Sequence, residues 1–432
     1  DWDVEIILPS ASGEGAITAT LVHGQPFTWF EFDGLVPEIT IGQPWDVVTA
    51  DEEGMAVRIG EDLYGIYFPV GSGYSVADGA LVFPEAAWLS VAPLPDAGDY
   101  ELFKPYAASV VRATEVSWSY DEGASLLMTV WNVSAENLRD PSGQAPVMQG
   151  FLPHVYKHCA GSSLDFSTLT YLTPRGTMKM AASASGSFSY GYRFSGMLPF
   201  YAAPAEGDLD ENGYDPEVMR QLIEAYADGG GFGGDTYWGG KGLTQMALNM
   251  TFAKQTGHAD LYERSKARLK AALTDWLTYT PGEETRFFAY YPRWGGMLGF
   301  DVSYDSDAFN DHHFHYGYFI YAAALLCMED KAFAASYGEL LTMIAKDYAN
   351  YDRDDKRFPF LRNLDPWAGH SYAGGLGDHG NDNGNGQESS SEAMQGWGGV
   401  YLLGVALGDR AMRDAGIFGW LTESRGTVEY WF

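Results

Sequence analysis

Three carboxylates in two short segments have the residue types and the spacing for acid/base chemistry. Asp311 begins the segment Asp311-His-His-Phe-His-Tyr-Gly-Tyr318, in which histidines and aromatic residues crowd one turn. Glu388 and Glu392 stand four residues apart, a spacing that places both side chains on one face of a helix. Two carboxyl groups from separate segments, one protonated and one ionised, are the minimum for acid/base cleavage of a glycosidic bond. We therefore take Asp311, Glu388 and Glu392 as candidate catalytic residues.

Asp311 also fits two simpler roles. It precedes an apolar run, where an aspartate commonly caps a helix. Together with His312, His313 and His315 it offers the donor types of a metal site. The spacing argues against a metal, because neighbouring histidines diverge on a helix and this segment has no His-x-x-x-His pair. An aromatic pocket would raise the pKa of Asp311 by desolvation, whereas a helix N-terminus would lower it.

Glu388 and Glu392 could also have roles other than catalysis. Acidic residues favour the start of a helix, but the three serines between Glu388 and Glu392 gain nothing there and suit a polar pocket. The helix dipole would favour the ionised carboxylate that a general base requires. A calcium loop is matched only in part by Asn381, Asn383, Asn385, Gly386 and Glu392, because its first position is Asn and glycines rather than a helix precede it. We expect no metal and no cofactor.

Three aromatic, glycine-rich segments resemble sugar-binding loops. They are Asp235-Thr-Tyr-Trp-Gly-Gly-Lys241, Tyr290-Tyr-Pro-Arg-Trp-Gly-Gly296 and Asp365-Pro-Trp-Ala-Gly-His370. Each could be ordinary loop packing, but together they would line a groove at one end of a helical domain. The candidate substrate contacts in them are Tyr237, Trp238, Lys241, Trp294 and Trp367.

The composition limits the class of protein and of ligand. The chain has 432 residues, 46% of them apolar, which suffices for two or three globular domains. A formal charge of −32 and a pI of about 4.4 would repel nucleic acid and anionic membranes but not a neutral polymer. The 13 tryptophans and 28 tyrosines are first of all core residues, and their number also favours surfaces that stack sugar rings.

Cysteine and hydropathy patterns indicate neither a disulfide scaffold nor a membrane protein. Cys159 and Cys327 lie far apart in apolar surroundings, which predicts two buried free thiols. The sequence has no run of about 18 apolar residues that could span a membrane. We expect a monomer that is either a mature secreted form or a fragment.

Residues 1–160 are predicted to form an antiparallel β-sandwich, because short β-branched and aromatic runs alternate with Gly, Pro and Asp. The clearest hairpin pairs Ala113–Tyr120 with Leu126–Trp131. Residues 161–212 have a mixed pattern that indicates a small linker domain.

Residues 213–432 have helical periodicity and predict an (α/α)6 toroid of stacked helical hairpins. The first helix is predicted to start after the cap Asp215 and to stop at Gly229. Further helices are predicted at about 242–256, 260–278, 313–328, 331–349, 388–407 and 409–418. A closed toroid of six hairpins needs more helices than these, so we expect the helical domain to be incomplete at its C-terminus.

The motifs around Asp311, Asp365–His370 and Gln387–Ala393 resemble glycoside hydrolase family 81, the endo-β-1,3-glucanases or laminarinases. Leu152-Pro-His154, Thr173-Pro-Arg-Gly-Thr-Met178 and Thr236-Tyr-Trp-Gly-Gly-Lys241 are similar to other stretches of that family. The resemblance covers nearly the whole chain. It implies a β-sandwich, a linking domain and an (α/α)6 barrel in that order, and full members are longer at both ends.

The resemblance also implies residue roles in an inverting, extracellular enzyme acting on β-1,3-glucan. Asp311 takes the role of general acid, and either Glu388 or Glu392 that of general base, with Glu388 favoured. His315 and His370 would hold substrate or tune the acid. The neighbouring side chains that we expect at the substrate are Asp307, His312 and Tyr316. A glucan-binding fragment without turnover and a polysaccharide lyase remain alternatives, although lyases tend to carry basic grooves.

Overall fold

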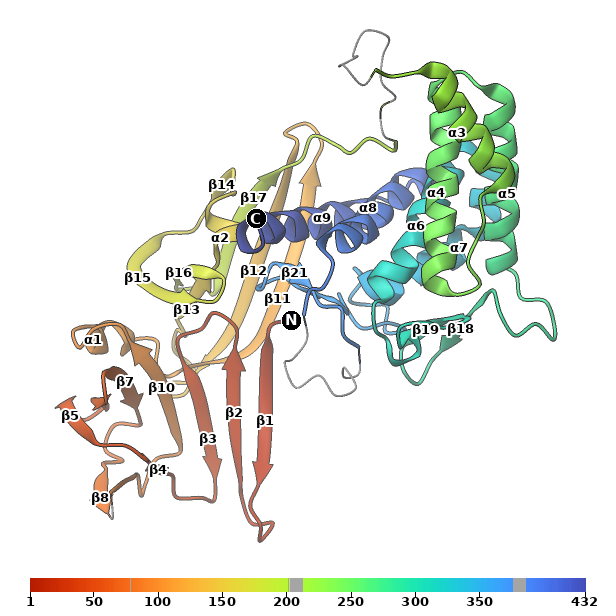
Figure 1. Cartoon of the computed structure of the whole chain (residues 1–432). Helices are drawn as coiled ribbons and strands as arrows, with labels where there is room; N and C mark the ends of the chain where they lie inside the picture. The colour runs from red at the N-terminus through yellow and green to blue at the C-terminus, as the bar shows by residue number, and fades with distance from the viewer. Residues whose placement is uncertain (78, 201, 203–212, 376–385) are drawn as a thin grey trace.

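The computed structural model has a β-rich N-terminal half and a helical C-terminal half (Figure 1), as predicted. It describes all residues except 78, 201, 203–212 and 376–385. The β-rich half consists of β1 Asp3–Pro9, β2 Ala16–Val22, β3 Thr28–Asp33, β4 Glu38–Thr40, β5 Trp45–Ala50, β6 Gly54–Ile59, β7 Asp62–Tyr67, β8 Ser75–Ala77, β9 Ala80–Val82, β10 Trp88–Leu94, α1 Asp99–Phe103, β11 Ser109–Asp121, β12 Leu126–Asn137, β13 Val147–Phe151, α2 Pro153–Tyr156, β14 Gly161–Ser162, β15 Phe166–Thr173, β16 Gly176–Ser183 and β17 Ser187–Arg193.

The larger sheets of this half are antiparallel. One has seven strands in the order β1-β2-β3-β10-β7-β6-β5, and another has four strands in the order β11-β12-β17-β14. The predicted hairpin is confirmed as β11 and β12, in which Val116 pairs with Trp131 and Glu115 with Asn132. The apolar pair is buried and the polar pair is exposed, as the alternation of a strand with one buried face requires.

The predicted domain boundary at residue 160 cuts through two sheets. Strands β14 and β17 pair within the sheet of β11 and β12, and β15 and β16 form a three-stranded sheet with β13. Residues 109–193 are therefore linked by backbone hydrogen bonds, and a boundary near 108 agrees better with the pairing. The sequence could not reveal this, because the alternation that marks a strand does not say which strand it pairs with.

The helical half contains α3 Pro216–Gly229, α4 Thr236–Gln255, α5 Ala259–Trp276, β18 Phe287–Tyr291, β19 Gly296–Phe300, η1 Ser306–Ala308, α6 His312–Glu329, α7 Lys331–Ala349, β20 Leu364–Asp365, β21 His370–Ser371, α8 Ser390–Leu407 and α9 Arg410–Tyr430. All seven predicted helices are present. Aspartates cap several of them: Asp215, for instance, accepts hydrogen bonds from the backbone N–H groups of Glu217 and Val218.

Two helices are longer than predicted. Helix α4 starts at Thr236, because the Asp235 side chain accepts hydrogen bonds from the N–H groups of Tyr237 and Trp238. Helix α9 continues past residue 418 through two glycines. A Cβ at Gly419 would overlap the Trp397 ring, and one at Gly426 would overlap the backbone of Gly369. Close packing thus requires glycine at both positions. Glycine disfavours a helix, but here the tertiary contacts outweigh its low helix propensity.

Helix α6 forms the centre of the helical half and packs against α4, α7 and α8. It is buried around nearly its whole circumference, as expected for a helix that is apolar on all sides. It approaches α8 most closely where Gly317 faces Gly396, since a Cβ on Gly317 would lie 2.7 Å from the Cα of Gly396. This crossing fixes how the start of α6, with Asp311, lies relative to the start of α8, with Glu388 and Glu392.

Substitution of Gly396 by alanine should therefore destabilise the protein. The added Cβ would overlap the carbonyl oxygen of His313 and push α6 and α8 apart, at a cost of about 1–3 kcal/mol in unfolding free energy. Urea unfolding measures this loss. Gly229→Ala is the matched control, because nothing lies within 4 Å of its Cβ, and it should stay within about 1 kcal/mol of wild type. Equal stability of both variants would contradict the tight crossing.

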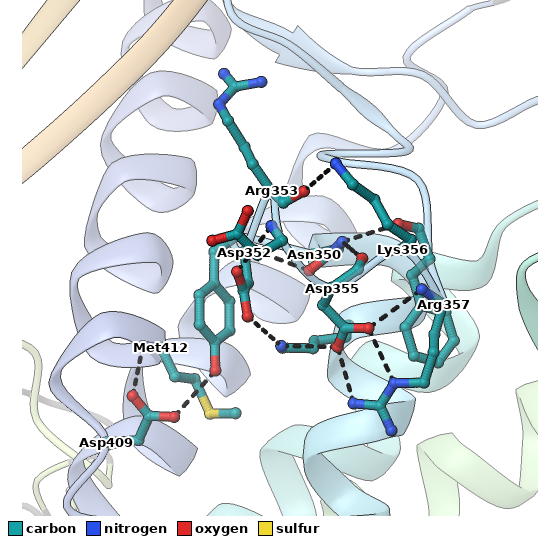
Figure 2. A network of polar contacts seen from close by, with 12 residues as sticks. Asn350, Asp352, Arg353, Asp355, Lys356, Arg357, Asp409 and Met412 are labelled. Atoms are coloured by element: carbon teal, nitrogen blue, oxygen red, sulfur yellow. Dashed lines mark hydrogen bonds and ion pairs between the residues drawn. The ribbon is translucent and has the colours of Figure 1, made fainter.

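A polar network holds the loop after α7 (Figure 2). Asn350 donates to the carbonyl oxygens of Asp355 and Phe358 at 3.1 and 2.8 Å. Arg353 donates to the carbonyl of Val116 in β11 at 3.0 Å and lies over the Phe360 ring. The network also ties this loop to the start of α9, because the Tyr351 hydroxyl donates to Asp409 at 3.0 Å.

Further predictions concern thiols and membranes. Both cysteines are free as predicted; Cys327 is buried, but Cys159 is only partly buried, which corrects that part of the prediction. Among the helices that the structure describes, none is both long and apolar enough to cross a bilayer.

Candidate active site

Asp311 stands at the start of α6 in an unusual backbone conformation. Its φ is 58°, in the left-handed region, and its side chain makes no capping hydrogen bond to the helix. Its backbone N–H donates to the carbonyl of Ala373 at 2.9 Å, while its own carbonyl accepts from the N–H of His315 at 2.9 Å. The helix-cap interpretation of this carboxylate is therefore wrong.

Glu388 lies two residues before α8 and shares the same uncommon conformation, with a φ of 64°. Its side chain is exposed to solvent. The N–H of Ala373 donates to the carbonyl of Gly386 at 2.9 Å, so one residue is bonded both to the Asp311 turn and to the Glu388 turn. Ala373 is buried together with Phe314 of α6 and Ala393 of α8. These contacts bring the two predicted catalytic segments together.

The left-handed conformation of Asp311 and Glu388 is an independent sign of function. Non-glycine residues rarely adopt it, and its cost of about 1–3 kcal/mol persists only where the surroundings enforce it, most often at functional sites. Tyr304, Asp305 and Phe309, which lead into the Asp311 turn, also have positive φ angles. The backbone around the predicted acid is thus strained over several residues.

Glu392 lies in the first turn of α8 within a polar cluster. The Tyr318 hydroxyl donates to its Oε1, and the Lys241 Nζ lies 3.5 Å from the same oxygen. Partial burial opposes ionisation of Glu392, but the hydrogen bonds from Tyr318 and Ser389 and the charge of Lys241 outweigh it and lower the pKa. Lys241 also donates to the Tyr237 hydroxyl at 2.6 Å. Glu392 is therefore an ionised and firmly held carboxylate.

His315 links this cluster to the Asp311 turn. Its ring lies 5.2 Å from that of Tyr237, and its Nδ1 lies 2.8 Å from the Thr236 hydroxyl. Burial lowers the pKa of His315 to about 3, so the ring is neutral. Its Nε2 is buried without a hydrogen-bond partner among the described residues. The predicted substrate-binding role of His315 remains a prediction.

The structure contradicts substrate contact for His312 and Tyr316. Both side chains are fully buried. The Nδ1 of His312 lies 2.5 Å from Oδ2 of Asp347, its Nε2 lies 2.7 Å from the Ser306 carbonyl, and Tyr316 donates to the Met297 carbonyl at 3.2 Å. Sequence shows residue type but not which way a helix faces, and these two residues face the core behind the site.

His370 and Trp367 also have structural partners. His370 is 1% exposed, accepts from Arg175 at 2.8 Å and donates from Nδ1 to the Ser371 carbonyl. Trp367 is half-buried and donates from its indole nitrogen to the Gly150 carbonyl in β13 at 2.9 Å. The burial of His370 argues against direct contact with substrate, and the substrate contact of Trp367 stays a prediction. Both side chains join the helical half to the β-rich half.

The remaining candidates are accessible. Trp238 is 52% exposed, and Trp294 is 54% exposed with its ring stacked on that of Tyr291 at 5.0 Å. Asp307, in η1, is exposed four residues before Asp311. These side chains can meet a ligand, and their roles as sugar contacts stay predictions.

The histidines of the Asp311 segment do not converge on a metal position. His312 is directed to Asp347 and His315 to Thr236, while His313 is buried with both ring nitrogens unbonded within the described structure. No cluster of three or more potential metal ligands occurs in the part of the chain that the structure describes. The candidate calcium ligands Asn381, Asn383 and Asn385 lie outside the described residues.

Residues 228–432 match the profile described as "Glycosyl hydrolase family 81 C-terminal domain". A glucan endo-1,3-beta-D-glucosidase from Acetivibrio thermocellus is 35% identical over 100% of this chain and 55% of its own length. The chain belongs to glycoside hydrolase family 81. A second relative of the same name, from Thermobifida fusca, is 31% identical over 100% of this chain and 56% of its own length.

A solved structure supports the family assignment. The family 81 glycoside hydrolase from Clostridium thermocellum, in a glutamate-to-alanine variant, has a TM-score of 0.90 and 35% identity, covering 100% of this chain and 60% of that one. The chain thus spans little more than half the length of the relatives it matches.

Sequence reasoning missed two residues that support this family 81 site. Tyr318 binds Glu392, and its spacing from Asp311 and His315, at seven and three residues, places all three on one face of α6. That spacing could have identified it. Glu423 could not be found this way, because it lies on α9, far from the motifs in sequence.

Glu423 is a fully buried carboxyl group whose two oxygens are both bonded. Oε1 accepts from the Gln387 amide at 2.7 Å, and Oε2 accepts from the Ser371 backbone N–H at 2.7 Å. Burial raises the pKa of Glu423 to about 7, although these hydrogen bonds lower it. A buried network thus reaches the residue next to Glu388 through the Gln387 side chain.

The raised pKa predicts a pH-dependent stability. The folded state binds the proton of Glu423 more tightly than the unfolded state, so this stabilisation is full below pH 4.5 and is lost as the pH rises through 7. Glu423→Gln cannot ionise. The unfolding free energy of wild type minus that of the variant should therefore fall by about 3 kcal/mol between pH 4.5 and pH 8. Urea unfolding at several pH values measures the difference, and a pH-independent value would contradict the buried, shifted carboxyl.

Proposed function

We propose that this chain hydrolyses internal β-1,3-glucosidic bonds of laminarin-like β-glucans with inversion of configuration. One observation carries the proposal: Asp311 and Glu388 lie in two strained turns that are both bonded to Ala373. The match to family 81 supports the same assignment. The similar proteins named glucan endo-1,3-beta-D-glucosidase support the substrate class. The net charge of −32 is compatible with an uncharged polymer as substrate.

In the proposed mechanism Asp311 protonates the leaving glycosidic oxygen while Glu388 activates a water molecule on the opposite face of the sugar. Inversion requires room for that water, so the two carboxyl groups should lie about 6.5–9.5 Å apart when substrate is bound. Glu388 suits the role of base because its side chain faces solvent. Glu392 suits an orienting role instead, because Tyr318 and Lys241 already hold its carboxylate.

The accessible aromatic side chains would bind the polymer. Trp238 and Trp294 are each about half exposed and offer ring faces for stacking on glucose units. Lys241, beside Glu392, would hydrogen-bond to hydroxyl groups of the sugar nearest the bond to be cleaved. His315, with its unbonded Nε2, would act in the same way from α6.

The architecture proposed around the site is a β-sandwich, a small linking domain and an (α/α)6 toroid, to which helices α3–α9 would contribute. Because a polymeric substrate does not cross a membrane, we propose that the protein acts outside the cell. We propose a monomer, since one chain supplies both carboxylates.

Incubation of the chain with laminarin tests the function. Release of new reducing ends in short oligosaccharides is expected. Laminarin binding without release would identify a glucan-binding module instead, and an unsaturated product absorbing in the ultraviolet would identify a lyase. A β-1,4-glucan serves as the control and should not be cleaved.

A further inference from the structure

Glu388 is the centre of a tight turn that needs support. The Ser389 N–H donates to the Gln387 carbonyl at 2.9 Å, two residues back, and the φ of Glu388 is 64°. A γ-turn whose central residue has a positive φ is rare and strained. Without an anchor on either side, such a turn would relax and redirect the Glu388 side chain.

The two flanks of the turn are held in different ways. On the C-terminal side the Ser389 carbonyl accepts from the Ala393 N–H at 3.1 Å and so joins the first turn of α8. On the N-terminal side the Gly386 carbonyl accepts from the Ala373 N–H at 2.9 Å, and the Gln387 side chain, which is 7% exposed, donates to Glu423 at 2.7 Å. This bond ties the Gln387 side chain to α9.

Glu423 also anchors the neighbouring segment. Its second oxygen accepts from the Ser371 N–H, and the Ser371 hydroxyl accepts from the Trp397 indole of α8 at 3.1 Å. Ala373, two residues further on, is bonded to both catalytic turns. One carboxyl group therefore connects α9 with the Glu388 turn and with the segment that supports Asp311.

A buried carboxyl group is a costly way to stabilise a fold, because well-packed apolar residues would serve at least as well. The position of Glu423 therefore calls for a role other than stability. Resting on the proposed function, we propose that Glu423 is a positioning residue that holds the Gln387–Ser389 turn, through the Gln387 amide, so that Glu388 is aimed at the scissile bond.

Kinetics on laminarin tests this role with Glu423→Met, which keeps the side-chain volume but removes both acceptors. The kcat should fall at least about tenfold with KM changed less than about threefold, because misplacing a catalytic group impairs chemistry more than binding. Glu423→Gln keeps one acceptor and should recover most of the lost kcat. Thr422→Val is the matched control on α9, since Thr422 is 1% exposed and its hydroxyl is unbonded within the described structure, and it should keep the wild-type kcat.

A double-mutant cycle separates positioning from general destabilisation. If Glu423 acts through Gln387, then Gln387→Met should lower kcat similarly, and the double variant should lose no more than Glu423→Met alone. Losses that multiply, or a wild-type kcat in Glu423→Met, would overturn the proposal.

A crystal structure of Glu423→Met distinguishes failure of this proposal from failure of the proposed function. We expect the backbone of residues 387–389 to be displaced or to adopt a negative φ at residue 388. An unchanged turn would overturn the positioning role even if the wild-type chain cleaves laminarin. If the wild-type chain cleaves no β-1,3-glucan, the proposed function fails, and a displaced turn still supports the role of Glu423 in holding it.

Discussion

Replacing Asp311 with asparagine is expected to lower kcat on laminarin by at least about 100-fold, the usual contribution of a general acid. Asparagine keeps the shape of the side chain and tolerates the left-handed backbone, but it cannot give a proton to the leaving oxygen. No helix-capping bond is lost, because the Asp311 side chain makes none. The unfolding free energy should therefore stay within about 1 kcal/mol of wild type.

The control for this variant is Asp305→Asn. Asp305 is exposed, has a φ of 56° and lies six residues before Asp311, so it tests the same substitution in the same backbone conformation. It should retain wild-type kcat. Unimpaired turnover by Asp311→Asn would remove Asp311 from the mechanism.

Replacing Glu388 with glutamine should have a comparable effect. An amide cannot accept the proton of the attacking water, so kcat is expected to fall by about 10²–10⁴-fold. Glu392→Gln is the matched comparison, four residues away in the same segment. We expect its loss to be near tenfold, because Tyr318 can still donate to the amide oxygen while only the ion pair with Lys241 is lost.

The ratio of these two losses assigns the base. A larger loss in Glu392→Gln than in Glu388→Gln would exchange the roles that we propose for the two glutamates. Unfolding measurements on both variants should accompany the kinetics, since Glu392 is bonded to α6 and its loss also affects stability.

The sequence was sufficient to predict the elements that depend on a local residue pattern. The β11–β12 hairpin follows from strict alternation, and the start of α3 follows from its capping aspartate and proline. The sequence does not show which strands pair when they are not consecutive in the chain. The predicted boundary at 160 therefore falls inside two sheets. The full length of α9 was also missed, because Gly419 and Gly426 are explained only by the neighbours that they contact.

The candidate site, too, could be predicted from the sequence only in part. The segments of Asp311 and Glu388 were identified from residue type and spacing, and the structure brings their backbones together at Ala373. The resemblance to family 81 implies substrate roles for His312 and His370, yet both side chains are buried in structural hydrogen bonds. Residue type alone cannot tell a buried histidine from one at the substrate.

The anomeric configuration of the first product tests the central claim most directly. Proton NMR of laminari-oligosaccharide cleavage, recorded within the first minutes, distinguishes the α from the β anomer before mutarotation mixes them. If Asp311 and Glu388 act as acid and base across a bound water, the newly formed reducing end appears first as the α anomer. Initial appearance of the β anomer would mean a covalent glycosyl-enzyme intermediate and would contradict the proposed pairing.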